Sequence, residues 1–420
     1  MTTDPITRAV ACNLCTGCGA CAGAFPEAIR MVEHPVHGRR PVVASGPAGR
    51  AAAEAAIGLC AGAETDHTAL PRRDAVDEMW GPVLAAWEGW AADPEIRHRG
   101  SSGGAVTALA LFALETGAVD SVAHIAASEA DPLENVAVQS TDRAGLLRGS
   151  GSRYSQASPC EALGPIAEAG RSAALIGKPC DIASAARAAA ADPRLADSLA
   201  LTIGIFCAGA PNRRSSETLL CQLGVPEGAQ ITALRYRGEG WPGTMQARWI
   251  DADGTAHDSE SVSYATGWDL LQKGRQWRCR ICTDHTAAFA DIAVGDPWHA
   301  PPVNGAPEPG RSLILARTPR GRRLIEAAIA AGALVAEPRA RDVVARAQPN
   351  LAATMGAVWG RRLAMRVAGL PVPKEKGLPL FRFWRHLPLR AQVQSVAGSL
   401  RRILSQALWR PIRMEPGHDV

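Results

Sequence analysis

The sequence lacks the features of an exported or membrane-spanning chain. Its longest clearly apolar stretch, Ala105 to Leu114, is too short to cross a bilayer. No charged amino terminus is followed by an apolar run, so we expect no secretory signal and a cytoplasmic protein. The net charge of +4 is small and gives no reason to expect nucleic acid as a partner. We find no internal repeat and no low-complexity segment.

The chain is instead rich in cysteine, with 11 in 420 residues. Disulfides are typical of small secreted proteins, whereas this is a large chain without a signal. In a reducing compartment, clustered cysteines are metal ligands or redox groups. The number and grouping of cysteines therefore predict a metal or redox centre.

The first group is dense, contains glycine and has no histidine: Cys12, Cys15, Cys18 and Cys21. Bacterial ferredoxin loops have the pattern C-x2-C-x2-C-x3-C-P, and the stretch from Cys15 follows it until Phe25, which stands where the fourth cysteine should be. The missing ligand is either Cys12 or a remote residue. Cys60 is the better candidate, because one short loop cannot easily place four successive cysteines around one cube. A four-cysteine zinc site is the alternative, although such sites usually combine two separate pairs.

The second group begins with Cys279 and Cys282, a pair that alone is equally typical of half a zinc site. Cys180 and Cys207 each follow a predicted strand, where the chemistry of α/β proteins usually lies. These four cysteines are candidates for a second cluster, and the alternative is that they are buried or reactive thiols.

The other two cysteines, Cys160 and Cys221, are not assigned as ligands. Cys221 lies in an apolar helical segment and is predicted to be a core residue.

A glycine-rich stretch opens a predicted helix and is a plausible anion cradle. It consists of Ser101, Ser102, Gly103 and Gly104, with Thr107 one turn into the helix. It matches neither GxGxxG nor the P-loop, so an ordinary serine N-cap is the alternative. Gly151, Ser152, Arg153 and Tyr154 form a second polar loop, and Lys178 adds a cation beside Cys180. One cofactor with a pyrophosphate and a redox ring would join these pieces.

Strand and helix patterns alternate from Arg99 to about Asp296, which predicts a mixed α/β fold around a largely parallel sheet covered by helices. Antiparallel strands are expected over 235–250. The predicted division is a ferredoxin-like iron–sulfur domain at 1–66, a connector at 67–98, a cofactor-binding part at 99–180, a second core part carrying the second group of cysteines at 181–345 and a helical basic tail at 346–420.

The tail has an unusual composition between Leu378 and Arg413, with seven arginines and no acidic residue. Apolar residues fall at helical spacing in it: Val393, Val396, Leu400, Ile403, Leu404 and Leu408. We expect a helix that docks on the core with a basic outer face. The alternative is a helix that contacts an anionic membrane surface or a partner, which would make the protein peripheral at the membrane.

Seven motifs occur in order along roughly residues 12–335: Cys15–Cys21, Ser101–Leu109, Gly151–Tyr154, Gly177–Asp181, Phe206–Pro211, Arg235–Gly243, and Cys279–Asp284 with Ala290–Trp298. Together they resemble the beta subunit family of the coenzyme F-420 (deazaflavin) hydrogenases and dehydrogenases. That family includes 7-hydroxymethyl chlorophyll a reductase and the ferredoxin-dependent divinyl chlorophyllide reductase. The chain departs from it in the missing local cysteine and in the tail after about Pro371.

The resemblance implies an iron–sulfur flavoprotein with FAD and 4Fe-4S clusters, of which we expect two. It implies that Cys15, Cys18, Cys21 and Cys60 hold one cluster and that Cys180, Cys207, Cys279 and Cys282 hold the other. It also implies that Ser101–Gly104, Thr107 and Gly151–Tyr154 contact the flavin. Lys178 or Arg153 would stabilise the anionic reduced flavin.

The expected function is oxidoreduction, with electrons passing between a ferredoxin-like donor, the clusters, FAD and an organic or deazaflavin substrate. Lys178, Asp181, Asp284 and Asp296 are the candidate catalytic groups, although acids beside glycine turns are often structural caps. The alternatives are an electron-transfer subunit of a larger oxidoreductase, with no substrate site of its own, and a protein that uses metal only structurally. An oligomer is compatible with the sequence.

Overall fold

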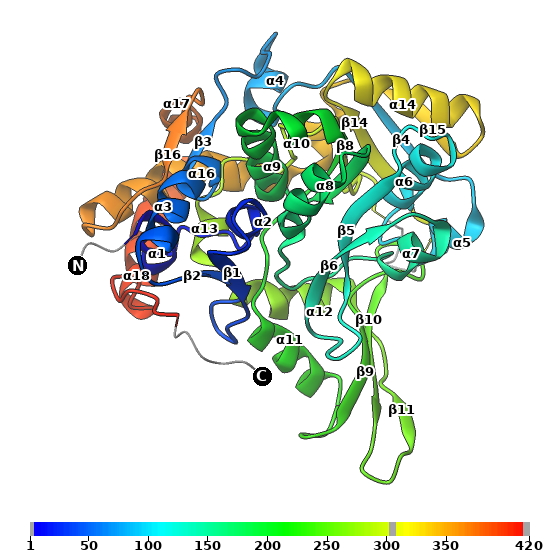
Figure 1. Cartoon of the computed structure of the whole chain (residues 1–420), viewed down its shortest axis with the longest axis horizontal. Coiled ribbons are helices and arrows are strands. Elements are labelled where there is room, and N and C mark those ends of the chain that lie inside the picture. The colour runs from blue at the N-terminus through cyan, green and yellow to red at the C-terminus, as the bar shows by residue number, and fades with distance from the viewer. Residues whose placement is uncertain (1–3, 302–307, 415–420) are drawn as a thin grey trace.

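An eight-stranded sheet forms the centre of the molecule in this computed structural model, which describes residues 4–301 and 308–414 (Figure 1). The strand order is β15–β4–β14–β13–β8–β7–β5–β6. The four middle strands, β13, β8, β7 and β5, run parallel, and the strands outside them pair antiparallel. The predicted mixed α/β fold with a parallel centre is confirmed. The strands are β4 (Ala85–Ala91), β5 (Ser121–Ala127), β6 (Asn135–Ser140), β7 (Ala173–Gly177), β8 (Leu199–Ile205), β13 (Ile292–Gly295), β14 (Ser312–Ala316) and β15 (Leu334–Arg339).

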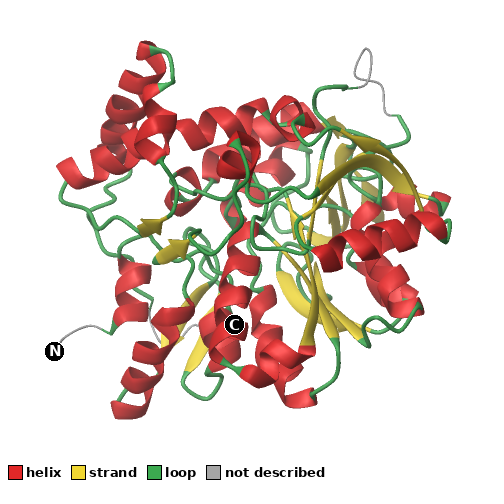
Figure 2. Ribbon diagram, turned by 90° about the horizontal axis from the view of Figure 1, so that it is seen from above, coloured by secondary structure: helices red, strands yellow, loops and turns green. Residues whose placement is uncertain are grey.

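Helices cover both faces of this sheet because its strands are apolar on both sides (Figure 2). In β7, Ala173 and Leu175 belong to one core cluster, and Ala174 between them belongs to the other. The first face is packed by α8 (Leu163–Ala169), α9 (Pro179–Ala191) and α10 (Pro193–Ser198). The second is packed by α6 (Ala105–Glu115), α7 (Arg143–Arg148) and α14 (Pro319–Ala330).

The predicted connector at 67–98 contributes a strand to this sheet. It holds α4 (Ala75–Trp80), β4 and α5 (Pro94–Arg99), and β4 pairs with both β14 and β15. Describing the stretch as a connector was wrong for this reason. The strand was missed because four of its first five residues are buried, so it shows no polar–apolar alternation.

The amino-terminal part has a small core of its own and a polar attachment to the sheet. Arg39 pairs with Glu134 at 2.9 Å and with Glu161 at 3.0 Å, and both carboxylates belong to the central part of the chain. The elements are α1 (Pro5–Ala11), α2 (Ala20–Ala24), β1 (Ile29–Val32), β2 (Arg40–Val43), α3 (Pro47–Ala56), a 3-10 turn η1 (Ile57–Leu59) and β3 (Glu64–Asp66).

A second lobe carries the predicted antiparallel strands, which project downward in Figure 1. β9 (Gln230–Arg235) and β10 (Thr244–Ile250) pair antiparallel as expected, and two short strands, β11 (Ala256–Asp258) and β12 (Val262–Ser263), join β10. α11 (Arg213–Gln222) and α12 (Tyr264–Leu271) pack on these strands. This lobe covers one side of the candidate site described below.

The tail docks on the two cysteine-bearing segments. α16 (Pro349–Val367) follows α15 (Val343–Ala347), and α18 (Leu389–Ser405) packs against it; between them lie β16 (Lys374–Lys376) and α17 (Leu380–Arg385). Ile403 of α18 shares a buried cluster with Leu14, beside the first cysteine loop, and with Ile281, between Cys279 and Cys282. The last six residues of the predicted tail, 415–420, lie outside the described residues.

The predicted apolar face of the tail helix is only partly correct. Ile403 is buried, and Val396, Leu400 and Leu408 are partly buried, but Val393 and Leu404 are exposed. The packing face of α18 also contains Ser395 and Ser399, which helical spacing of apolar residues does not reveal. Within the described residues, no helix is both long and apolar enough to cross a membrane.

Candidate functional site

Four cysteines of the amino-terminal part surround one small cavity. Cys15 and Cys18 come from the loop after α1, Cys21 from α2, and Cys60 from the end of η1. The backbone N–H of Gly17 donates to Cys15 Sγ at 3.4 Å. Cys12, the alternative to Cys60, does not line the cavity, and its side chain packs in the cluster of Leu14 and the tail. The structure thus brings together the four cysteines of the expected ligand set that includes Cys60.

Crowding and burial shift the titration of these thiols. Burial raises the pKa of Cys60 to about 12, with further contributions from the charges of Cys15 and Cys18. Burial likewise raises the pKa of Cys21 well above its usual value. Cys18 differs, because a hydrogen bond from Cys160 lowers its pKa to about 6. A metal centre held by these sulfurs would require deprotonated thiols, so loading would release protons here.

The second set of cysteines also converges. Cys180 begins α9, Cys207 follows β8, and Cys279 and Cys282 lie in and after α13 (Trp277–Arg280). Burial, followed by the charge of Cys279, raises the pKa of Cys207 to about 12, and Cys282 also contributes. Burial, followed by the charge of Asp181, raises the pKa of Cys180, and the charge of Cys207 contributes. Cys207 thus interacts electrostatically with each of the other three sulfurs.

Backbone N–H groups point at the sulfurs of this second set. Gly209 donates to Cys207 Sγ at 3.3 Å, and Ala210 donates to Cys279 Sγ at 3.5 Å. Hydrogen bonds to cysteine sulfur are one of the means by which proteins tune the potentials of iron–sulfur clusters.

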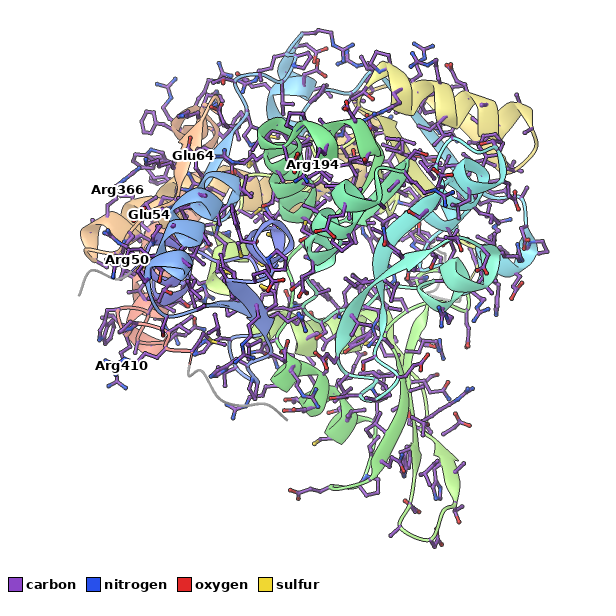
Figure 3. The ribbon with its side chains drawn as sticks, viewed as in Figure 1. Arg50, Glu54, Glu64, Arg194, Arg366 and Arg410 are labelled. Atoms are coloured by element: carbon purple, nitrogen blue, oxygen red, sulfur yellow. The ribbon has the colours of Figure 1, made fainter. Side chains whose placement is uncertain are left out.

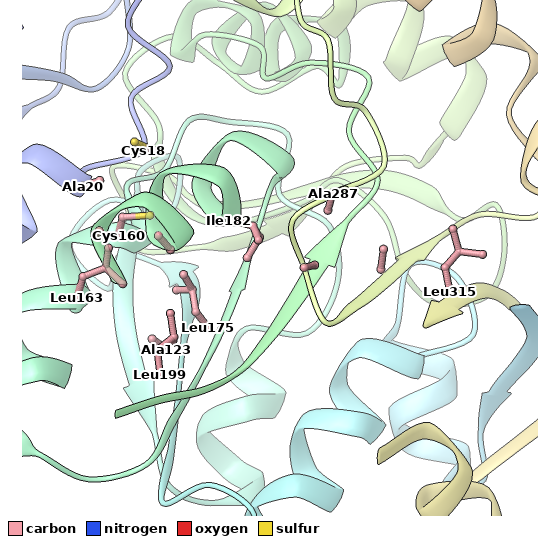
Figure 4. Packing of buried hydrophobic residues seen from close by; sticks show 14 of the residues in the cluster. Cys18, Ala20, Ala123, Cys160, Leu163, Leu175, Ile182, Leu199, Ala287 and Leu315 are labelled. Atoms are coloured by element: carbon pink, nitrogen blue, oxygen red, sulfur yellow. The ribbon is translucent and has the colours of Figure 1, made fainter. Parts of the chain in front are cut away.

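The two cysteine sets approach each other at the amino-terminal turns of α9. Cys18 Sγ lies 3.4 Å from Ser184 Oγ in α9, and that same hydroxyl accepts a hydrogen bond from the backbone of Ala61, next to Cys60. Cys160 Sγ also lies 3.3 Å from the backbone oxygen of Asp181, adjacent to Cys180. Figure 4 shows Cys18 and Cys160 side by side in the buried cluster that also contains Ile182 of α9.

A larger cavity of about 290 Å³ adjoins the second set of cysteines. Its volume is close to the lower end of the range for small-molecule sites. Cys207 lines this cavity. Nine of the ten residues expected to bind a cofactor line it as well: Ser101, Ser102, Gly104, Thr107, Gly151, Ser152, Arg153, Tyr154 and Lys178. Gly103 does not line it; its N–H donates to Ser312 Oγ at 2.9 Å, which anchors the loop to β14.

The amino terminus of α6 opens on this cavity. Gly104 has the left-handed φ of +72°, which lets the loop turn into the helix. Ser101 Oγ is buried and makes no hydrogen bond with any residue that the structure describes. Free helix N–H groups beside an unpartnered hydroxyl suit a phosphate, so the donor set fits the anion cradle expected from the sequence.

Lys178 is a fixed cation that also lines the cavity. Its Nζ lies 2.7 Å from Asp181 Oδ2, which also accepts the backbone N–H of Lys178 at 2.8 Å. Burial disfavours the charge on Lys178, but the carboxylate of Asp181 and the thiolate of Cys180 outweigh it and hold the lysine pKa above its usual value.

Arg153, the other expected cation, is occupied by the protein itself. Its guanidinium donates to Asn135 Oδ1 and to the backbone oxygen of Pro132, and it stacks over the ring of Tyr236 at 5.5 Å. Lys178 is therefore better placed than Arg153 to act on a ligand in the cavity.

The sequence did not single out a buried arginine and three aromatic rings that line the cavity. Arg237 has its carbon centre 4.6 Å from the ring of Tyr264, and that ring stacks with Trp298 at 5.5 Å and with Trp268 at 6.4 Å. Arg237 and Trp298 lie in motifs quoted for the family resemblance, which was the available signal. Tyr264 and Trp268 lie on α12, and nothing in the sequence pattern places that helix at the cavity.

The candidate acids are already bound to other groups. Asp296 makes a two-pronged ion pair with Arg237, at 2.8 and 3.0 Å, and also accepts the indole N–H of Trp241. Asp181 pairs with Lys178 as described. Asp284 accepts the backbone N–H groups of Thr286 and Ala288, which makes it a cap of its loop. Each position fits a residue that holds a neighbour in place.

Two further observations concern the cysteines. Cys221 is exposed on α11, so its prediction as a core residue was wrong; Leu219 and Leu220 form the buried face of that helix instead.

Over residues 4–301 and 308–414, no group of three or more His, Cys, Asp or Glu side chains is set closely enough to hold a single metal ion. A mononuclear site holds its ligands at about 2–2.3 Å from one ion, whereas the sulfurs around a cube bind separate irons.

Comparisons with known proteins point to one family, that of the coenzyme F420 hydrogenase/dehydrogenase beta subunit. Residues 86–163 match the model of its N-terminal domain, and residues 170–342 match the model of its C terminus. The uncharacterized protein MJ0725 of Methanocaldococcus jannaschii is 24% identical over 208 residues, 49% of this chain and 72% of that protein. A similar fold occurs in a chain of the F420-reducing [NiFe] hydrogenase complex from Methanosarcina barkeri, in a structure derivatised with xenon. The TM-score is 0.51 and the sequence identity 21%, and the match covers 74% of this chain and 99% of that one.

Proposed function

Given that the chain belongs to the coenzyme F420 hydrogenase/dehydrogenase beta subunit family, we propose that it is an iron–sulfur flavoprotein oxidoreductase. Two 4Fe-4S clusters would be held by Cys15, Cys18, Cys21 and Cys60, and by Cys180, Cys207, Cys279 and Cys282. FAD would occupy the large cavity. When bound, these groups would carry single electrons and exchange electron pairs with an organic or deazaflavin substrate.

The main support is the convergence of three sites at the start of α9. The first set of cysteines reaches it through Cys18, the second begins at Cys180, and Lys178 between β7 and α9 lines the cavity. One helix terminus thus joins two sulfur-rich sites and a cavity with an anion cradle. A protein that used metal only to stabilise its fold would not need this arrangement.

The protein's own groups have distinct tasks in this proposal. Ser101 Oγ and the N–H groups at the start of α6 would bind the pyrophosphate of the cofactor. Lys178 would stabilise negative charge on the reduced ring, and Asp181 would hold its ammonium group in position. The aromatic side chains of Tyr264, Trp268 and Trp298 would offer stacking surfaces and exclude water.

A second candidate is an electron-transfer subunit that has no substrate site of its own. The fold similarity to a chain of a multi-subunit hydrogenase complex favours it and suggests partner subunits. Turnover of an added substrate by the isolated chain with reduced ferredoxin would support the enzyme. A co-purifying oxidoreductase, together with no turnover by the chain alone, would support the second candidate.

The first test is anaerobic purification with iron, sulfide, zinc and flavin quantified. We expect about eight irons and one FAD per chain. The variant Cys282→Ser should lose about half of the iron, whereas Cys221→Ser, on the exposed face of α11, should keep all of it. Zinc without flavin in the wild type, or full iron in Cys282→Ser, would contradict the proposal.

A further inference from the structure

Four arginines gather beside the second set of cysteines. They come from three segments: Arg275 and Arg280 lie before and at the end of α13, Arg361 lies in α16 and Arg402 in α18. Arg275 and Arg280 are next to Cys279: a Cβ added at Gly209 would lie 2.8 Å from Arg275 Cδ and 3.1 Å from Cys279 Cβ, and Arg280 follows Cys279 in the chain.

Three of these guanidinium groups donate to backbone oxygens, and none of the four pairs with a carboxylate that the structure describes. Arg275 donates to the oxygen of Ala208 at 2.8 Å, and Arg361 donates to that of Arg280 at 2.6 Å. Among the described residues, none of the four arginines makes an ion pair, and Arg280 Nε is buried without a partner. The side chain of Arg402 makes no hydrogen bond with any described residue.

Such a group is electrostatically unfavourable without an anion. Burial, followed by the charges of Arg275 and Arg402, lowers the pKa of Arg361 to about 10. Positive charges removed from water are stabilised by an anion. Cys279 would supply negative charge beside Arg275 and Arg280, whereas the arginines that line the groove described next have no acidic residue beside them in it.

An open groove of about 660 Å³ between α16 and α18 leads to this group. Arg361, Arg401 and Arg402 line it together with small or uncharged residues, and no acidic residue is among them. Both helices lie beyond residues 86–342, the part of the chain matched by the family. The groove therefore lies outside the part of the chain that the two family models match.

Exposed apolar side chains are concentrated in the tail, although none of them lines the groove. Of the eight large apolar residues that are exposed in the described part of the chain, six lie between Val367 and Trp409. Leu389, Val393 and Leu404 are three of them and belong to α18 itself. A mixture of arginine and exposed apolar side chains is typical of protein interfaces.

We propose that the groove between α16 and α18 is a docking site for an acidic electron-carrier protein, whose carboxylates pair with Arg361, Arg401 and Arg402. The docked carrier lies beside the segment that holds Cys279 and Cys282. Its role as an electron carrier rests on the proposed function, whereas the docking of an acidic protein surface does not. A protruding acidic segment fits a concave site, and a flat lipid surface does not enter a groove.

Binding of a small acidic ferredoxin to the full-length protein, in its oxidised form and without turnover, tests the proposal. The variant R401E/R402E reverses two charges in the groove, and neither side chain makes an ion pair with a described residue. The control R366E/R410E makes the same change in net charge on exposed arginines of the same tail that lie outside the groove (Figure 3).

At about 0.15 M salt, where screening extends over ~8 Å, R401E/R402E should weaken binding about tenfold or more and R366E/R410E by less than about twofold. Equal affinities for the wild type and R401E/R402E, or no binding by a wild type that carries iron and flavin, would overturn the docking site. A third result would also overturn the docking site, in favour of a membrane contact. In it, the wild type binds phosphatidylserine-containing vesicles but not the ferredoxin, and R401E/R402E no longer binds the vesicles. If the wild type contains neither iron nor flavin but binds the ferredoxin more tightly than R401E/R402E does, the docking site is supported and the proposed function is contradicted.

Discussion

Cys60 and Cys12 show how much a single position matters here. Cys12 is three residues from Cys15, and Cys60 is far along the chain, yet only Cys60 lines the cavity with Cys15, Cys18 and Cys21. The backbone explains the difference. Cys12 caps the end of α1 and its side chain packs beside the tail, whereas the turn η1 directs Cys60 toward the loop.

The variant Cys60→Ser should therefore lose one cluster, and Cys12→Ser should lose none. We expect iron to fall from about eight to about four per chain in Cys60→Ser, because a cube needs all four thiolates. Iron and sulfide analysis of anaerobically purified protein measures this directly. The opposite pattern, with iron lost only in Cys12→Ser, would identify Cys12 as the ligand.

At the scale of single elements, α6 carries the anion cradle and has a left-handed glycine at each end. Gly104 precedes the helix with φ +72°, and Gly117 follows it with φ +68°. Their surroundings differ. A Cβ on Gly104 would lie 2.6 Å from the backbone oxygen of Ile96, whereas a Cβ on Gly117 would meet nothing within 4 Å.

Gly104→Ala should therefore be much more harmful than Gly117→Ala. The latter should cost about 1–2 kcal/mol, the usual strain of a left-handed alanine. The former adds a clash with a carbonyl that cannot move away, so it should cost several kcal/mol by the same principles and reduce bound flavin by displacing the start of α6. Thermal unfolding and flavin absorbance of both variants test this, and equal flavin content would argue against a cradle at this terminus.

At the scale of the whole molecule, the tail connects the two cysteine-bearing segments. β16 pairs in parallel with β3, close to the first set, and Glu375 in β16 accepts hydrogen bonds from Thr283 at 2.6 Å and Arg362 at 3.3 Å. His67 follows β3 and lies 3.4 Å from Glu375. Burial, followed by the charge of Arg72, lowers the pKa of His67 to about 4, so the imidazole is neutral in this junction.

The junction should make the protein less stable in mild acid. The unfolded imidazole has a pKa near 6.5, so its proton is bound more readily by the unfolded chain, and the stabilisation present above pH 6.5 is lost as the pH falls toward 4. Between pH 8 and pH 5.5 this contribution amounts to roughly 1–2 kcal/mol.

His67→Phe keeps a ring against Phe289, whose centre lies 4.9 Å from the imidazole, and removes the titration. Between pH 8 and pH 5.5, the free energy of unfolding in urea should fall less for the variant than for the wild type, by roughly 1–2 kcal/mol. The comparison at pH 8, where both side chains are neutral, measures packing alone. An unchanged difference between the two proteins at both pH values would mean that His67 does not carry this dependence.

The sequence indicated much of this architecture because the relevant signals are local. Alternating apolar strands and helices predicted the parallel centre, and the run from Cys15 to Cys21 predicted a sulfur-rich loop. Strand β4 was missed because burial on both faces removes alternation, and Cys221 was misplaced because its apolar neighbours Leu219 and Leu220 face the other way.

The sequence by itself determined the family, the fold class and the residue types available for chemistry, since these follow from local order and composition. Only the tertiary structure decided which distant residues meet. It brought Cys60 rather than Cys12 to the first cavity, placed Tyr264 and Trp268 on the wall of the second, and gathered arginines of α16 and α18 in one groove. The physical reason is that such meetings depend on how whole elements pack, and packing is set by the summed contacts of the entire chain.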